Sequence, residues 1–216
     1  MIGAIQLKIC GLTSLVDADL AGGCGADYLG FILHAKSPRS VSLARFREMA
    51  GRLAGRQKVA VDVEPGPDAL LAMRDAGFDR FQVHFRHDVP LQAIEAWAEA
   101  VGSRNLWLAP KLPPGVDVPE AWLGLAQAIL MDTFDPALFG GTGRTGDWPK
   151  FRRNSARNPG ITWILSGGLN PGNVGEALAE TGARFLDVNS GVESAPGVKD
   201  HGRLKAFAAA VRSAAA

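Results

Sequence analysis

Short apolar runs recur along the whole chain, and each is bounded by polar or glycine-containing segments. Most of the runs are rich in Ile, Leu, Val or aromatic residues and are about as long as a β-strand. We therefore expect strands at Ile5–Cys10, Tyr28–Leu33, Lys58–Val63, Arg80–Phe85, Asn105–Ala109, Ala128–Asp132, Ile161–Ser166 and Arg184–Asn189.

Several segments between these runs have the periodicity of amphipathic helices. In Ser42–Leu53, for example, Leu43, Phe46 and Leu53 fall on one helical face and the charged residues fall elsewhere. We expect helices at Ser14–Gly22, Ser42–Leu53, Leu91–Val101 and Gly202–Val211, and a further one that opens at Asn170-Pro171 with a cap residue and a first-turn proline.

Strands that alternate with helices predict a parallel sheet with right-handed crossovers. Eight strand–helix units in 216 residues leave about 27 residues for each unit, which favours a compact, closed (β/α)8 TIM barrel. An open, doubly wound sheet is the alternative, and it needs fewer strands. No linker or change of composition divides the chain, so we expect residues 1–216 to form a single catalytic domain.

Composition narrows the classes of partner. The chain is 47% hydrophobic and 21% charged, and its net charge of +1 gives no overall field for nucleic acid or an anionic membrane. No apolar run approaches the roughly 18 residues of a membrane helix, and Met1–Cys10 lacks the pattern of a secretory signal. Two cysteines, Cys10 and Cys24, are too few for a disulfide scaffold, so we expect a cytoplasmic protein. Histidines and cysteines do not cluster at metal-ligand spacing, so we predict no metal site.

In a barrel of this class, chemistry takes place at the C-terminal ends of the strands and in the loops that follow them. Polar or glycine residues stand there in six of the eight units: Cys10, Lys36, Arg39, His84, Asp132, Gly167-Gly168, Asp187, Ser190 and Gly191. We expect the functional site at this end of the barrel.

The last two of these loops carry glycines at equivalent positions, Gly167-Gly168 and Ser190-Gly191. Backbone amides without a nearby Cβ can close around a phosphate, and barrels commonly bind phosphate in their seventh and eighth loops. The pairing favours a phosphate site, although glycines that only permit tight turns are the alternative.

The sixth loop contains a nominal G-x-G-x-x-G at Gly141, Gly143 and Gly146. A dinucleotide site is excluded because these glycines lie well beyond the strand end and Ser166 stands where the acidic ribose ligand is expected. A loop that folds over a ligand and a plain glycine-rich surface loop are both left open.

The candidate acid, base and anion-binding residues are single side chains at strand ends. Cys10 is either a small apolar core residue or a base, which needs a thiolate favoured by nearby cations. Partial burial of Asp132 would raise its pKa and suit a general acid. Arg39 suits bidentate recognition of a carboxylate or phosphate. Lys8 shares a strand face with Cys10, and the first and last strands of a closed barrel adjoin, so we predict a Lys8–Asp187 pair.

Taken in order, the motifs resemble those of the phosphoribosylanthranilate isomerase family of tryptophan biosynthesis, over nearly the whole chain. Each motif is weak alone, and their collinear order is specific. They are Lys8-Ile9-Cys10-Gly11-Leu12-Thr13, Ala26–Phe31, Lys36-Ser37-Pro38-Arg39, Gln82-Val83-His84, Met131-Asp132-Thr133, Gly140-Gly141-Thr142-Gly143, Asp147-Trp148, Gly167–Pro171, Asp187–Glu193 and Pro196–Asp200.

The resemblance implies a cofactor-free Amadori rearrangement of a small phosphorylated substrate. By that resemblance, Asp132 is the general acid and Cys10 the general base. The substrate contacts are Arg39, which binds the anthranilate carboxylate, together with His84, Gly141 and Asp187, and the phosphate is held by Gly167, Gly168, Ser190 and Gly191. The molecule is expected to be a monomer or a homodimer.

Four features depart from the family pattern: Leu33-His34-Ala35, Asp62, Phe85 and Gly146. Phe85 stands where glycine usually follows the strand histidine, so we expect a bulky group that reshapes the pocket around His84. A non-catalytic or altered-substrate phosphosugar-binding barrel is the alternative function, although such a protein needs neither acid nor base. A histidine-pathway isomerase is a weaker alternative, because that relative uses a paired-aspartate site rather than a cysteine on the first strand.

Overall fold

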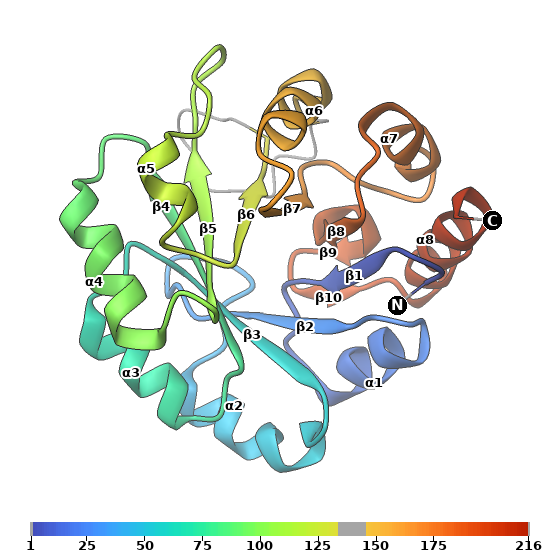
Figure 1. The fold of residues 1–216 in the computed structure, drawn as a ribbon. Helices are drawn as coiled ribbons and strands as arrows, with labels where there is room; N and C mark the ends of the chain where they lie inside the picture. Colours follow the sequence, from blue (N-terminus) through green and yellow to red (C-terminus); the bar gives the residue numbers. More distant parts are fainter. Residues whose placement is uncertain (1, 134–145, 216) are drawn as a thin grey trace.

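The computed structural model describes residues 2–133 and 146–215, and in it eight parallel strands close into a barrel in the order β1 to β8 (Figure 1). The strands are β1 Gln6–Ile9, β2 Tyr28–Ile32, β3 Gln57–Val63, β4 Arg80–Arg86, β5 Leu106–Lys111, β6 Ala128–Met131, β7 Thr162–Leu165 and β8 Phe185–Val188. The predicted single-domain (β/α)8 TIM barrel is confirmed, and the alternative of an open sheet is wrong because β1 pairs with β8.

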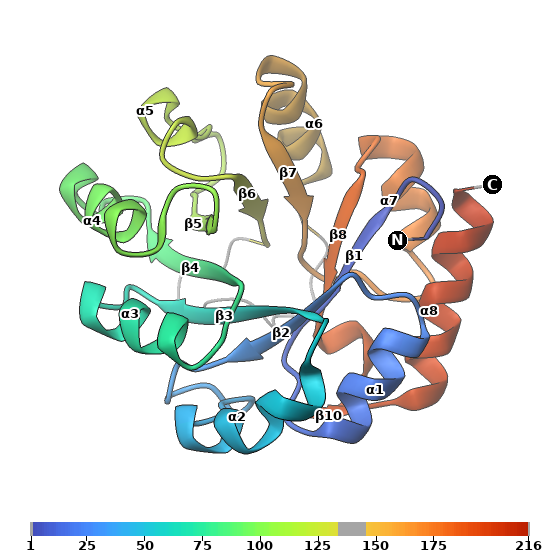
Figure 2. The same cartoon turned by 60° about the horizontal axis from the view of Figure 1, so that its bottom comes forward.

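Helices surround the strands on the outside (Figure 2). They are α1 Leu15–Gly23, α2 Leu43–Ala50, α3 Pro67–Asp75, α4 Leu91–Val101, α5 Glu120–Leu123, α6 Trp148–Arg157, α7 Val174–Thr181 and α8 His201–Ala214, with short 3-10 turns η1 Gly51–Leu53 and η2 Ser190–Val192. Within the described residues, no helix combines the length and the apolar character needed to cross a membrane.

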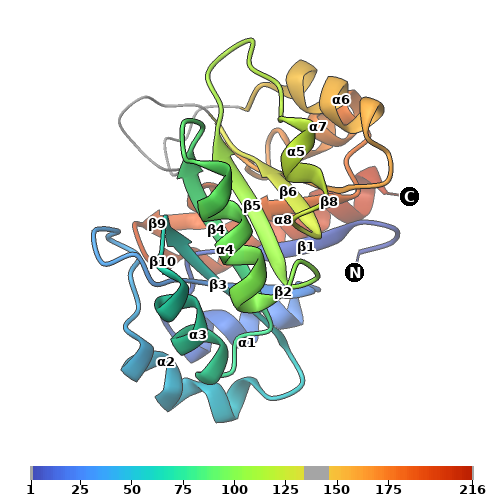
Figure 3. The same cartoon turned by 60° about the vertical axis from the view of Figure 1, so that its left-hand side comes forward.

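Two local elements differ from the prediction. The helix expected to open at Asn170-Pro171 begins at Val174 instead, because Asn170 makes a turn: its side chain accepts from the amide of Gly172 and its amide donates to the side chain of Asn173. A two-stranded hairpin, β9 Glu193–Ala195 and β10 Val198–Lys199, was not predicted. It lies at the same end of the barrel as the loop that follows β2 (Figure 3).

The barrel interior is closed at its N-terminal end by aromatic rings. Tyr28 and Phe185 begin β2 and β8, and their ring centroids lie 5.2 Å apart. Trp107 packs edge-on against both rings, at 4.9 Å and 5.4 Å. Above this layer, the small or aliphatic side chains of Val59, Ala109 and others fill the interior. Access from solvent is therefore left to the C-terminal end, where the predicted site residues stand.

Candidate active site

A buried ion pair crosses the seam between the first and last strands. Lys8 and Asp187 are register partners of β1 and β8, and Lys8 Nζ lies 2.9 Å from Asp187 Oδ1. Lys8 is fully buried, and the side chain of Asp187 is 6% exposed. The predicted pair is confirmed. Two opposite charges are thus held inside the barrel, near the side chains proposed to exchange protons.

Cys10 lies directly after β1, two residues beyond Lys8 and on the same face. It is 4% exposed and packs with the side chains of the barrel interior. Burial raises the pKa of the thiol, while the Lys8 ammonium acts in the opposite direction. Cys10 is therefore mainly a thiol at neutral pH, and the nearby cation is the group that favours its thiolate.

Asp132 follows β6 and lies at the mouth of the barrel. Desolvation by burial raises the pKa of its carboxyl to about 6, although the amide of Thr133 donates to Oδ1 at 2.7 Å and favours the charged form. Asp187 adds to the rise and Lys8 opposes it. The expected rise in the pKa of Asp132 is confirmed. The charges of Lys8 and Asp187 influence the pKa values of both Cys10 and Asp132. The structure therefore places the candidate acid and the candidate base around the Lys8–Asp187 pair.

His84, in β4, also faces the interior. Burial, with further contributions from Lys8 and His34, lowers its pKa to about 3, so the imidazole is neutral at physiological pH. One of its ring nitrogens, Nε2, lies 2.7 Å from Gln82 Nε2, and Oε1 of Gln82 is buried with no hydrogen-bond partner. His84 is thus a neutral polar group whose orientation is set by the buried side chain of Gln82.

The expectation that Phe85 reshapes the pocket is wrong. Successive residues of a strand point to opposite faces, so Phe85 faces the helix layer when His84 faces the interior. The Phe85 ring lies 5.3 Å from the rings of both Trp97 in α4 and Trp122 in α5. The Phe85 side chain therefore packs between the barrel and the helices and does not enter the pocket.

Two other departures from the family pattern come together at the ends of β2 and β3. His34 Nδ1 lies 3.4 Å from Asp62 Oδ1, and both side chains are partly exposed. Burial raises the pKa of Asp62, while the amide of Val63 and the His34 ring lower it. Their contact was not predictable from the sequence, because the two residues come from different strand–helix units.

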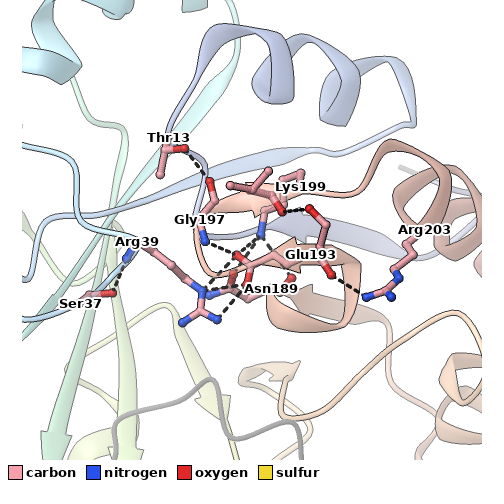
Figure 4. Close-up of polar contacts among 10 residues, drawn as sticks. Thr13, Ser37, Arg39, Asn189, Glu193, Gly197, Lys199 and Arg203 are labelled. Atoms are coloured by element: carbon pink, nitrogen blue, oxygen red, sulfur yellow. Dashed lines mark hydrogen bonds and ion pairs between the residues drawn. The ribbon is translucent and has the colours of Figure 1, made fainter.

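Arg39 lies in the loop between β2 and α2, and its guanidinium is held by Glu193 of the β9–β10 hairpin (Figure 4). Arg39 Nη2 donates to Glu193 Oε2 at 2.8 Å, and Lys199 Nζ donates to Oε1 at 3.0 Å. The predicted anion-binding arginine therefore has a fixed carboxylate partner within the protein. Glu193 and Lys199 belong to the motifs that carry the family resemblance, but no role was predicted for either residue.

The seventh and eighth loops meet closely at their glycines. Gly167 and Gly168 have φ of +92° and +63°, which other residues rarely adopt. Their N–H groups have no hydrogen-bond partner within residues 2–133 and 146–215. A Cβ added to Gly191 would collide with the carbonyl oxygen of Leu169, so Gly191 permits the two loops to touch. Ser190 precedes it and begins η2.

A pocket of about 230 Å³ opens beside Asp132. Its lining includes Leu165 of β7 and Ser166 directly after it, together with Lys150 of α6 and the α6 cap residue Asp147. Lys150 donates to the backbone carbonyls of Leu112 and Pro113. The predicted substrate contact Gly141 lies outside the described residues. Among the residues that are described, no group of three or more His, Cys, Asp or Glu side chains is placed to hold a metal ion.

Comparison with known proteins gives a consistent result. The family model of N-(5'-phosphoribosyl)anthranilate (PRA) isomerase matches residues 7–210. The N-(5'-phosphoribosyl)anthranilate isomerase of Cellvibrio japonicus is 37% identical over 217 residues, which cover 94% of this chain and 92% of the relative. The enzyme of the same name from Allorhizobium ampelinum is 40% identical over 223 residues, with 98% and 95% covered.

Solved structures agree in both fold and sequence. Phosphoribosyl anthranilate isomerase from Thermus thermophilus superposes with a TM-score of 0.80 at 34% identity, covering 97% of this chain and 99% of that chain. Another isomerase of this name, in complex with reduced 1-(o-carboxyphenylamino)-1-deoxyribulose 5-phosphate, has a TM-score of 0.75 at 29% identity, with 97% and 99% covered. The chain therefore belongs to the N-(5'-phosphoribosyl)anthranilate isomerase family.

Proposed function

We propose that this protein converts N-(5'-phosphoribosyl)anthranilate into 1-(2-carboxyphenylamino)-1-deoxyribulose 5-phosphate in tryptophan biosynthesis, without a cofactor. One observation carries the proposal: a carboxyl with a pKa of about 6 and a buried thiol face the same Lys8–Asp187 pair at the barrel mouth. A carboxyl of this pKa is a better proton donor at neutral pH than an ordinary aspartic acid, because more of it is protonated.

In the first step, Asp132 protonates the ring oxygen of the ribofuranose, and the C1–O bond breaks to give a Schiff base between C1 and the anthranilate nitrogen. In the second step, the thiolate of Cys10 removes the proton from C2, and the electron pair moves to form an enolamine. Tautomerisation of the enolamine gives the ketone at C2 and a saturated C1. The two steps need an acid and a base at different positions around the sugar, and β6 and β1 supply them.

The remaining predicted residues bind the substrate in this proposal. Arg39 contacts the anthranilate carboxylate, and a neutral His84 offers one donor or acceptor to the sugar. The phosphate lies against the amides of Gly167 and Gly168 and against Ser190 and Gly191, where the seventh and eighth loops touch. We also assign substrate contact to Asp187 and Gly141. Net charge is almost zero, so the anionic substrate is bound by these local donors.

All residues assigned a role belong to one chain, so a monomer and a homodimer both accommodate the proposal, and sedimentation analysis distinguishes them. Two free, buried cysteines agree with action in a reducing cytoplasm. The competing function is a phosphosugar-binding barrel without catalysis. Binding alone does not require a general acid and a general base at the mouth of the barrel.

The proposal is tested by complementation of a tryptophan auxotroph that lacks this isomerase. The wild-type chain should restore growth without tryptophan, and the variants Cys10→Ala and Asp132→Asn should not. A matched variant, Cys24→Ala, removes the other thiol and should leave growth intact, because Cys24 caps α1 away from the barrel mouth. Failure of the well-expressed wild-type chain to restore growth would favour a binder.

A further inference from the structure

The carboxylate of Glu193 is nearly buried beside the barrel mouth, with 4% of its side chain exposed. Arg39 Nε lies 3.0 Å from each carboxylate oxygen, and Arg39 Nη2 lies 2.8 Å from Oε2. Lys199 Nζ donates to Oε1 at 3.0 Å, and the amide of Gly197 donates to the same oxygen at 3.3 Å. Burial opposes ionisation, but Arg39 and Lys199 together lower the pKa of Glu193, so it is charged at neutral pH.

This carboxylate occupies one edge of the Arg39 guanidinium. Both Nε and Nη2 are engaged, whereas Nη1 has no hydrogen-bond partner in the part of the chain that the structure describes. The side chain of Arg39 is only 13% exposed. Its Cδ lies over Gly11, where an added Cβ would be 3.1 Å away. The guanidinium is therefore fixed directly beside the Cys10–Gly11 turn, and residues 2–133 and 146–215 supply no acceptor for Nη1.

The buried charges of this cluster do not balance. Arg39 and Lys199 carry two positive charges, and Glu193 carries one negative charge. Arg203, the next cation along, donates to the backbone carbonyl of Glu193 and lies 3.7 Å from Asp200, so that pair adds no net charge. A buried site with one unmatched positive charge is stabilised by a ligand that brings one negative charge. A carboxylate meets that requirement.

The β9–β10 hairpin connects three loops of the barrel mouth. Lys199 donates to Oδ1 of Asn189 at 2.9 Å, and Asn189 in turn packs against Gly11 after β1. The carbonyl of Gly197 accepts from Thr13 Oγ1 at 2.7 Å (Figure 4). The hairpin that carries Glu193 is thus anchored on the loop that bears Cys10, and its position relative to that loop is defined.

We propose that Glu193 is a positioning residue: by holding the Nε–Nη2 edge of Arg39, it presents Nη1 to the substrate's carboxylate and makes the site selective for carboxylated aryl amines. This inference rests on the proposed function, and it assigns the selectivity to a residue that does not touch the substrate. A pre-oriented guanidinium loses less conformational entropy on binding than a free one, and that difference is the source of the selectivity.

The test compares two ligands by titration calorimetry with the full-length protein. One is reduced 1-(o-carboxyphenylamino)-1-deoxyribulose 5-phosphate, and the other is the same compound without the carboxyl group. The quantity of interest is the ratio of their dissociation constants. The variant Glu193→Gln alone leaves Lys199 as an unpaired buried charge and endangers folding. The double variant Glu193→Gln/Lys199→Met avoids this and keeps the cluster's net charge at +1, so it isolates positioning from charge.

The double variant should reduce the preference for the carboxylated ligand by roughly tenfold, the size of coupling found between residues in direct contact. Affinity for the carboxyl-free ligand should stay within about twofold, since phosphate and sugar contacts are unchanged. In an Arg39→Ala background, the same double change should leave the ratio as it is. Glu48→Gln, which breaks the exposed Arg45–Glu48 pair on α2, is the matched control and should not alter the ratio.

An unchanged ratio in the folded double variant would overturn the inference, and so would an equal weakening of both ligands, which a purely structural role produces. These results leave the proposed function intact, because the wild-type protein still prefers the carboxylated ligand. If the wild-type protein binds neither ligand, the proposed function itself fails, and the inference fails with it.

Discussion

Asp132→Asn should make the protein more stable at neutral and alkaline pH while it abolishes catalysis. The wild-type carboxylate is destabilised by burial, and its pKa of about 6 measures the cost of ionising it in the folded state. An asparagine keeps the shape and still accepts the hydrogen bond from the Thr133 amide. It carries no charge, so the cost is removed.

The magnitude follows from the two pKa values. The ordinary pKa of an aspartic acid, about 3.9, applies to the unfolded chain, and the pKa in the folded protein is about 6. At pH 8 the carboxyl is ionised in both the folded and the unfolded protein, and the difference lowers the free energy of unfolding by about 3 kcal/mol. A carboxyl whose pKa is raised by folding lowers the stability fully at pH values above its folded-state pKa. It has no such effect at pH values well below its unfolded-state pKa, where it is protonated in both states. The gain should therefore shrink to about 0.5 kcal/mol at pH 4.

Urea denaturation of the wild type and Asp132→Asn at pH 4 and pH 8 measures both gains directly. Asp117→Asn is the matched control, because Arg153 and Asn154 lower the pKa of that carboxyl and its removal should cost stability at pH 8. Equal stability of the wild type and Asp132→Asn at pH 8 would contradict a raised pKa of Asp132 in the folded protein, as would a gain of the same size at both pH values.

Four further predictions concern catalysis and the buried pair. Cys10→Ala should lower kcat by at least about two orders of magnitude in a steady-state assay, and near-normal turnover would remove its role as base. The active form has a thiolate at Cys10 and a protonated Asp132, so kcat/KM should rise up to about pH 6 as the thiolate fraction grows. It should then stay level, because further gain of thiolate is offset by loss of the Asp132 proton, and fall only above the raised pKa of the Cys10 thiol. An optimum below pH 5 would contradict this assignment. In urea titrations, Lys8→Met should lower the free energy of unfolding by about 3–5 kcal/mol, because Asp187 is left buried and unpaired. The double variant Lys8→Met/Asp187→Leu should recover most of that loss, and unchanged stability of the single variant would contradict the role of the pair. Arg39→Ala should raise KM far more than it lowers kcat, and an equal loss of affinity for a carboxyl-free ligand would exclude the carboxylate contact.

The barrel and the ion pair at its centre were predictable because they depend on local alternation and closure. Side chains two apart share a strand face, and closure places the first strand beside the last. Those two rules are sufficient to bring Lys8 to Asp187 across 179 positions of sequence. They also place Cys10 on the inner face. The raised pKa of Asp132 followed from the apolar run that precedes it.

Contacts between loops were not predictable in the same way. Arg39 and Glu193 are 154 positions apart and belong to irregular segments, whose conformation is not encoded in a hydrophobic period. The His34–Asp62 contact has the same origin. Phe85 was misjudged although strand alternation already places it opposite His84. The start of α7 was misjudged because the Asn170 side chain stabilises a turn where a cap was expected.

Asp132 and Cys10 are the proposed acid and base in the rearrangement of N-(5'-phosphoribosyl)anthranilate. This role is tested by conversion of the compound, prepared with deuterium at C2 of the ribose, by the purified wild-type protein. The expected result is formation of 1-(2-carboxyphenylamino)-1-deoxyribulose 5-phosphate with loss of the deuterium from C2, and no product above background with Cys10→Ala or Asp132→Asn. Binding of the compound without conversion, or product formation by Cys10→Ala or Asp132→Asn at a rate close to that of the wild type, would contradict this role.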